Sequence, residues 1–138
     1  MIYAFDTNII SFILRPNHNP EVVQKFSDII KQGFEYVIPP LCYYEIYWHL
    51  LRKKATAQLQ VFEKLYSDSL PNFNMGEAEF LLAAKIKAEL VEKGTPIGNR
   101  DADIFIASYC ITNGYTLVTD NTSDFSRIAD LHFVNWKE

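Results

Sequence analysis

Four carboxylates in this sequence come from widely separated segments, and each lies within or beside a predicted strand or helix. They are Asp6, Glu45, Asp103 and Asp120. If the fold gathers them, each negative charge raises the pKa of its neighbours, so the group stays ionised only with cations present. Sites built from oxygen ligands alone favour Mg²⁺ or Mn²⁺ over zinc. The usual partner of such a metal is a phosphate, so the four acids predict metal-dependent hydrolysis of a phosphodiester.

Each acid also has a purely structural interpretation. Asp6 or the following Thr7 can cap the helix that begins after the first strand. Glu45 can pair with His49, four residues later on the same helix. Asp120 follows a strand, where turns favour Asp. The functional interpretation rests on these separate segments converging on one edge of a sheet, where ligands of open α/β sheets bind.

Asp101 and Asp103 stand together at the start of a helix, and the directions of their side chains distinguish them. If the helix begins at Ala102, Asp101 is its N-cap and points about 200° away from Asp103, at about 100° per residue. The apolar Ile106 and Ala107 continue the stripe of Asp103 toward the sheet. We therefore expect Asp103 to reach the metal and Asp101 to cap the helix.

The segments that carry these acids alternate between strand and helix patterns. Strands are predicted at 2–5, 36–38, 115–119 and 131–136 with a short extended piece at 71–74, and helices at 9–14, 20–32, 40–51, 56–66, 74–93 and 102–111. This alternation predicts an α/β fold with a mostly parallel sheet covered by helices. The helices at 40–51 and 56–66 are expected to form a projecting hairpin.

Three local signals give boundaries within this pattern. Asn74 to Glu77 has the spacing of a capping box, Asn113-Gly114 is typical of a left-handed helix end, and 127–130 resembles a turn. The helix at 40–51 is apolar on almost every side and rich in aromatic residues, more than one small core needs. We therefore expect this helix to contribute to contact with a protein partner.

Composition limits the class of protein. The 138 residues predict one domain with a substantial core, and 49% of them are hydrophobic, which excludes disorder. Cys42 and Cys110 lie in apolar helical runs, where buried thiols are expected rather than a disulfide. The N-terminus lacks the pattern of a signal peptide, so a soluble cytoplasmic protein is expected. The net charge of −4 argues weakly against a nucleic-acid partner unless the acids are concentrated in a cation site.

The ordered set of motifs resembles the PIN-domain nucleases, and within them the VapC-type toxins of type II toxin–antitoxin systems. The resemblance covers essentially the whole chain. It is carried by Asp6-Thr7-Asn8, the lone helical Glu45, the segments 103–107 and 117–121, and Asp124-Phe125. It implies a single PIN-like domain over 1–138, folded as an α/β/α sandwich. It also implies a Mg²⁺ or Mn²⁺ site, endoribonuclease activity on RNA, a homodimer, and inhibition by a small cognate antitoxin.

The resemblance also implies roles for individual residues. The catalytic metal ligands are expected to be Asp6, Glu45, Asp103 and Asp120. Residues expected to orient these ligands or water, or to replace one of them, are Thr7, Asn8, Asp101, Thr119 and Asn121. Asn121 is the alternative to Asp120 because the family pattern after this strand is often Thr-x-Asp or Thr-x-Asn. Basic residues placed to contact RNA are Arg52, Lys53 and Arg100.

Two other functions fit part of the pattern. A receiver or phosphatase domain on a doubly wound sheet would use Asp6 as its nucleophile, but the Asp6-Thr7-Asn8 sequence lacks the second acid that such a site needs. A PIN-like binding module would bind a partner without cleaving RNA. Intact acids at all four positions favour the nuclease over this module.

Overall fold

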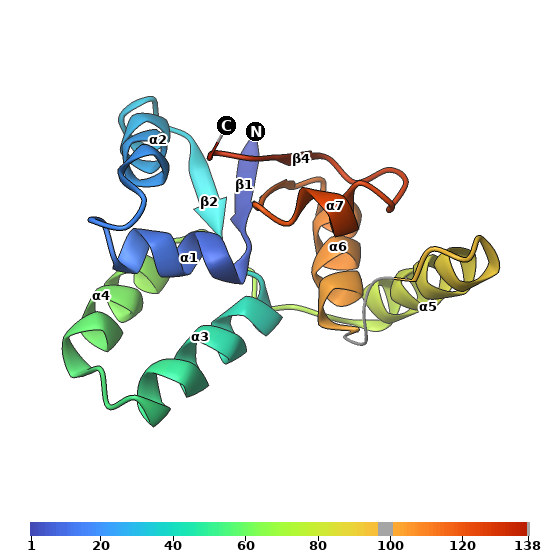
Figure 1. Ribbon diagram of the computed structural model, residues 1–138, viewed down its shortest axis with the longest axis horizontal. Coiled ribbons are helices and arrows are strands. Elements are labelled where there is room, and N and C mark those ends of the chain that lie inside the picture. Colours follow the sequence, from blue (N-terminus) through green and yellow to red (C-terminus); the bar gives the residue numbers. More distant parts are fainter. Residues whose placement is uncertain (97–100, 138) are drawn as a thin grey trace.

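The computed structural model describes residues 1–96 and 101–137 and has a four-stranded sheet at its centre (Figure 1). All strand pairs are parallel, and the strand order is β2-β1-β3-β4. The elements are β1 (Ile2–Phe5), α1 (Thr7–Leu14), α2 (Pro20–Lys31), β2 (Glu35–Val37), α3 (Pro40–Arg52), α4 (Thr56–Ser67), α5 (Glu77–Glu92), α6 (Ala102–Asn113), β3 (Thr116–Val118), α7 (Thr122–Phe125) and β4 (Phe133–Val134). The parallel sheet and its helical layers confirm the predicted α/β architecture.

An aromatic cluster fixes the end of β1, the strand that leads into the candidate site. Phe5 is fully buried, and its ring stacks on Tyr36 of β2 with centroids 5.2 Å apart. Edge-on contacts to Phe26 of α2 and to Trp136 near the C-terminus complete the cluster. Because aromatic pairs add to the energy of burial, this packing anchors the backbone that presents the next residue, Asp6.

The helix α6 is the central helix of the C-terminal half, as its apolar sequence predicts. Half of its 12 residues are buried, and the αL conformation of Gly114 (φ 72°) ends it. α5 packs along α6, and α3 contacts α1, α4 and α6. α3 and α4 form the predicted helical hairpin, below α1 in Figure 1. No helix within the described residues is both long and apolar enough to cross a bilayer.

Three predicted boundaries are wrong. Residues 71–74 form no strand, because Asn72 is held by side chains instead: its carbonyl accepts from the Tyr109 hydroxyl at 2.8 Å, and its Nδ2 donates to the Tyr115 hydroxyl at 2.8 Å. The N-cap of α5 is Gly76 rather than Asn74, and the Gly76 N–H donates to Glu79 Oε2 at 2.9 Å.

The third error concerns the last strand, predicted at 131–136 but found only at Phe133–Val134. Leu131 and Trp136 are buried, which explains the apolar pattern without a longer strand. The sequence motif Pro96-Ile97-Gly98, which precedes α6 and also resembles the PIN-domain nucleases, lies outside the described residues after Pro96.

Candidate active site

Asp6 follows β1 directly and is the most buried acid of the predicted set, with 6% of its surface exposed. Its Oδ1 accepts the Thr7 N–H at 2.8 Å, and its Oδ2 accepts the Thr119 hydroxyl at 2.7 Å. Asp6 is also the N-cap of α1, so the structural interpretation of this residue holds beside the functional one. Both oxygens are fixed in direction by these two donors.

Thr119 lies at the end of β3, the strand beside β1, and is fully buried. Besides donating to Asp6, its Oγ1 accepts the Asn121 N–H at 3.0 Å. One hydroxyl therefore connects Asp6 to the loop that carries Asp120 and Asn121. The convergence of two strand ends predicted from the sequence is confirmed at this position.

Glu45 reaches the same region from α3. Its Oε1 accepts the Thr7 hydroxyl at 3.3 Å, which directs the carboxylate toward the start of α1. The alternative partner, His49, lies beside Trp48, with ring centroids 5.8 Å apart. Thr7 thus bonds to two of the predicted acids, Asp6 through its N–H and Glu45 through its hydroxyl.

Asp120 and Asp103 are held by amide side chains. Asn8 Nδ2 donates to Asp120 Oδ1 at 3.3 Å, and Lys137 Nζ lies 3.8 Å from Asp120 Oδ2. Asn121 Nδ2 lies 3.4 Å from Asp103 Oδ2. The amide nitrogen of Asn121 therefore faces Asp103. This contact links α6 to the loop after β3.

Asp124 is an acid to which the sequence analysis gave no separate role. Asn121 Nδ2 also donates to Asp124 Oδ2 at 3.2 Å, and Arg127 lies 3.9 Å from Asp124 Oδ1. The sequence signal that could have indicated this role is the spacing of Asn121 and Asp124, three residues apart at the start of α7. Asp124 shares its amide donor with Asp103, so it adds a further carboxylate beside the site.

Burial raises the pKa of Asp6, and the negative charges of Glu45 and Asp120 raise it further. The hydrogen bonds from Thr119 and from the Thr7 N–H act in the opposite direction, because they stabilise the carboxylate. Asp6 therefore senses two of the three other predicted acids. Its ionised form is costly in the protein alone and would be favoured by a cation.

The four acids do not form a ready-made cluster. Among residues 1–96 and 101–137, no three acidic, histidine or cysteine side chains are close enough to make a metal-binding group. Like charges repel when no cation separates them, and hydroxyl and amide groups lie between these carboxylates. The donors nevertheless fit a hard divalent cation, because they are carboxylate oxygens already oriented by neighbouring hydrogen bonds.

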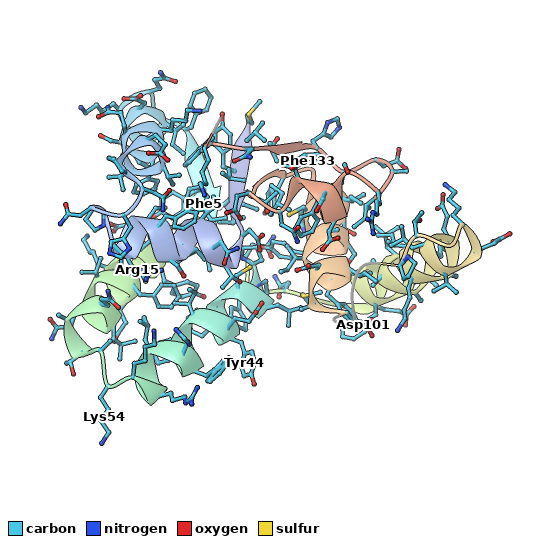
Figure 2. All side chains as sticks on the ribbon, in the orientation of Figure 1. Phe5, Arg15, Tyr44, Lys54, Asp101 and Phe133 are labelled. Carbon is cyan, nitrogen blue, oxygen red and sulfur yellow. The ribbon has the colours of Figure 1, made fainter. Side chains whose placement is uncertain are left out.

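Asp101 is separated from the other acids. It occupies the N-cap position of α6, and α6 begins at Ala102 as predicted, but its side chain makes no capping hydrogen bond. The carboxylate instead pairs with Lys87 of α5 at 3.0 Å, and both side chains are exposed. Figure 2 shows Asp101 at the N-terminal end of α6. The predicted capping bond is therefore wrong, because a lysine on the neighbouring helix attracts the carboxylate. Arg100 lies outside the described residues.

The two cysteines lie beneath the acids. Cys42 and Cys110 are buried free thiols, as predicted. Burial raises the pKa of the Cys42 thiol well above its usual range, and the charge of Asp6 raises it further. Both thiols therefore remain protonated and belong to the core.

A model of the PIN domain family matches residues 3–131. The chain belongs to the PIN domain family. This confirms the resemblance drawn from the motifs and excludes the receiver or phosphatase alternative.

Similar proteins match this PIN domain over nearly its full length. Ribonuclease VapC2 of Rickettsia felis is 28% identical over 136 residues, covering 99% of this chain and 98% of the relative. The tRNA(fMet)-specific endonuclease VapC of Shigella flexneri is 27% identical over 134 residues, covering 97% of each. Among solved structures, VapBC-1 of nontypeable Haemophilus influenzae has a TM-score of 0.82 at 26% identity and covers 100% of both chains.

Proposed function

We propose that this PIN domain is a metal-dependent endoribonuclease that hydrolyses RNA phosphodiester bonds and acts as the toxin of a type II toxin–antitoxin pair. Relatives named ribonuclease and tRNA-specific endonuclease support the reaction and the substrate class. The observation that carries the proposal is the buried carboxylate of Asp6, held by Thr119 and Thr7 beside two further acids. A buried, charge-repelled carboxylate is typical of a functional site.

In this proposal the cation is Mg²⁺ or Mn²⁺, and the carboxylates that hold it are Asp6, Glu45, Asp103 and Asp120. A divalent cation supplies an activated water and neutralises charge on the phosphodiester. The oxygen-only donor set favours these two ions over softer metals.

The chain's other contribution is to orient the acids. Thr119 and Thr7 fix the two oxygens of Asp6, Asn8 holds Asp120, and Asn121 faces Asp103. Such neighbouring hydrogen bonds set the direction and basicity of metal ligands. Because burial raises the pKa of Asp6, the bonds from Thr119 and Thr7 favour the ionised form that a cation needs.

Contacts to the RNA backbone are assigned to Arg52 and Lys53, the exposed basic end of α3. Arg100 is proposed for the same role from its sequence position. We propose that the protein acts in the cytoplasm, because its substrate is RNA. Its free thiols, such as Cys42, fit that location, since cytosolic thiols are kept reduced.

The test of the reaction is cleavage of RNA by the purified chain. The first RNA to use is initiator tRNA, because the Shigella relative is named for it. We expect cleavage with Mg²⁺ or Mn²⁺, none with excess EDTA, and none from Asp6→Asn at any metal concentration. Asp68→Asn, an exposed acid of the C-terminal end of α4, is the matched control and should cleave normally. A folded chain that binds RNA but never cleaves it would instead be the binding module.

The partner we propose is a small antitoxin that covers the acidic site, and the active form is a homodimer. The VapC names of the relatives support the proposal that the chain is a toxin with an antitoxin partner. Two exposed apolar side chains on α5 favour the homodimer: Phe80 and Val91, 55% and 60% exposed, lie on one face of this helix, on either side of Lys87. Co-expression with the product of an adjacent short reading frame should relieve growth arrest. Arrest that persists although both chains are present and bound would contradict the antitoxin assignment.

A further inference from the structure

The basic side chains of this acidic chain are distributed unevenly. In the described part, ion pairs with carboxylates are made by Lys64, Lys87, Lys93, Arg127 and Lys137. Four of the described cations that make no ion pair with a carboxylate lie at the C-terminal ends of two neighbouring helices, Arg15 after α1 and Arg52, Lys53 and Lys54 at the end of α3. Unpaired positive charge is therefore concentrated at one place.

A small cavity lies at that place, between α1, α3 and α4. It has a volume of about 60 Å³, and its polar lining consists of Ser11, Arg15, His49, Lys53 and Gln58 over an aliphatic floor. We call these five residues the basic hollow. No acid lines it. Cations at helix C-termini are favoured by the helix dipole, but the dipole does not explain why they surround a cavity that also offers hydroxyl and amide donors.

The basic hollow and the acidic site are connected by the same two helices. α1 begins after Asp6 and ends before Arg15, and α3 carries both Glu45 and Lys53. The eight residues of α1 separate the two places by about 12 Å, at about 1.5 Å per residue. Figure 2 shows Arg15 at the end of α1 away from Phe5, and Lys54 beyond the end of α3.

We propose that the basic hollow holds a backbone phosphate of the RNA strand, away from the phosphodiester that is cleaved at Asp6. The inference rests on the proposed nuclease function and adds a second contact point for its substrate. Arg15 and Lys53 neutralise the phosphate charge, and Ser11 and Gln58 donate hydrogen bonds to its oxygens.

The occupant is a nucleic-acid strand rather than an acidic protein because of where the hollow lies. It admits one small anionic group at a time, such as a phosphate. It is separated from Asp6 only by the length of α1, so a strand with regularly spaced phosphates can reach both places. A strand held at two points is oriented relative to the catalytic carboxylates, which lowers the entropic cost of cleavage.

The salt dependence of RNA binding tests this inference, because each phosphate contact contributes about 0.7 to the slope of log Kd against log salt for single strands. The probe is a fluorescein-labelled single-stranded RNA of mixed sequence, bound to the full chain in EDTA so that no cleavage occurs. We expect the double variant Arg15→Gln/Lys53→Gln to reduce the slope by about 0.7, the contribution of one phosphate, and each single variant to reduce it by part of that amount.

Lys31→Gln is the matched control, since Lys31 is an exposed cation at the end of α2, away from the hollow. Its slope should equal that of the wild type. Unchanged slopes for both Arg15→Gln and Lys53→Gln would overturn the inference, and so would variants that only weaken a complex with a protein partner. If the wild type still cleaves RNA in that case, the proposed function stands and only the phosphate-binding role of the hollow is rejected. A wild type that neither binds nor cleaves RNA would contradict both the proposed function and this inference.

Discussion

The hydroxyl of Thr119 donates a 2.7 Å hydrogen bond to Oδ2 of Asp6, joining the ends of β3 and β1 across 113 positions of sequence. This bond stabilises the carboxylate of Asp6 against the effect of its burial. It also links Asp6 to the loop after β3, because the same oxygen accepts the N–H of Asn121.

Thr119→Val removes that hydrogen bond at nearly constant volume. We expect the pKa of Asp6 to rise further, so that the acidic limb of the pH–rate profile for RNA cleavage moves to higher pH. The free energy of unfolding should fall by about 1–3 kcal/mol, the cost of a buried partner left unsatisfied. Thr116→Val, the same change earlier in β3, is the control. An unshifted pH profile in Thr119→Val would show that the bond does not tune Asp6.

Asp6→Asn should stabilise the metal-free protein at neutral pH. Burial raises the pKa of Asp6 in the folded state above its ordinary value of 3.8, so ionised Asp6 costs stability above the folded pKa. That cost disappears as the pH falls below the unfolded value. The difference in Tm between Asp6→Asn and wild type, measured in EDTA, should be positive at about pH 7 and shrink toward about pH 4. A lower Tm for Asp6→Asn at neutral pH would contradict the repulsion between Asp6, Glu45 and Asp120.

Asp101 and Asp103 should differ in metal binding. Asp103→Ala should abolish measurable Mg²⁺ or Mn²⁺ binding by calorimetry and destroy cleavage. Asp101→Ala removes only an exposed pair with Lys87, so it should cost about 0–1 kcal/mol of stability, less than a lost helix cap, and leave metal affinity unchanged. Loss of metal binding in Asp101→Ala with retention in Asp103→Ala would reverse the assignment.

The exposed apolar side chains on one face of α5 should govern the proposed self-association. Val91→Glu places a negative charge on this face and should convert the proposed homodimer to a monomer in sedimentation velocity. Its effect on stability should stay within about 0.5 kcal/mol, as for other surface changes. Glu92→Gln, one residue further along α5, is a control that should remain dimeric. A Val91→Glu chain that sediments as a dimer would place the interface elsewhere.

The sequence predicts the elements of this fold well because each has a strong local signal. Gly114 marks the end of α6 through its αL conformation, and Asp6 marks the end of β1 by following a short apolar run. The position of Asp103 follows from helical spacing alone. These features depend on residues close in sequence, whose physical effects can be summed without knowledge of the tertiary structure.

Features that depend on distant partners could not be predicted. The partner of Asp101 is Lys87, which lies on another helix, and nothing in the local pattern distinguishes this pairing from a helix cap. Asn121 faces Asp103 with its amide nitrogen, a direction that only the tertiary structure fixes. Which aromatic residues of α3 are packed and which are exposed is also seen only in the tertiary structure. Tyr43 packs on Tyr66 and Phe73, whereas Trp48 is exposed. A protein contact through α3 stays a prediction.

The strand order β2-β1-β3-β4 has a consequence for the protein while it is being synthesised. The ribosome produces the chain from its N-terminus at about 5–20 residues per second, so Asp6 emerges well before Thr119, which lies 113 positions later. Until β3 pairs with β1, one edge of β1 is open and Asp6 lacks the donor that fixes Oδ2. A nascent chain from which β3 has not yet emerged therefore carries an incomplete site, in which Asp6 is held by the N–H of Thr7 alone.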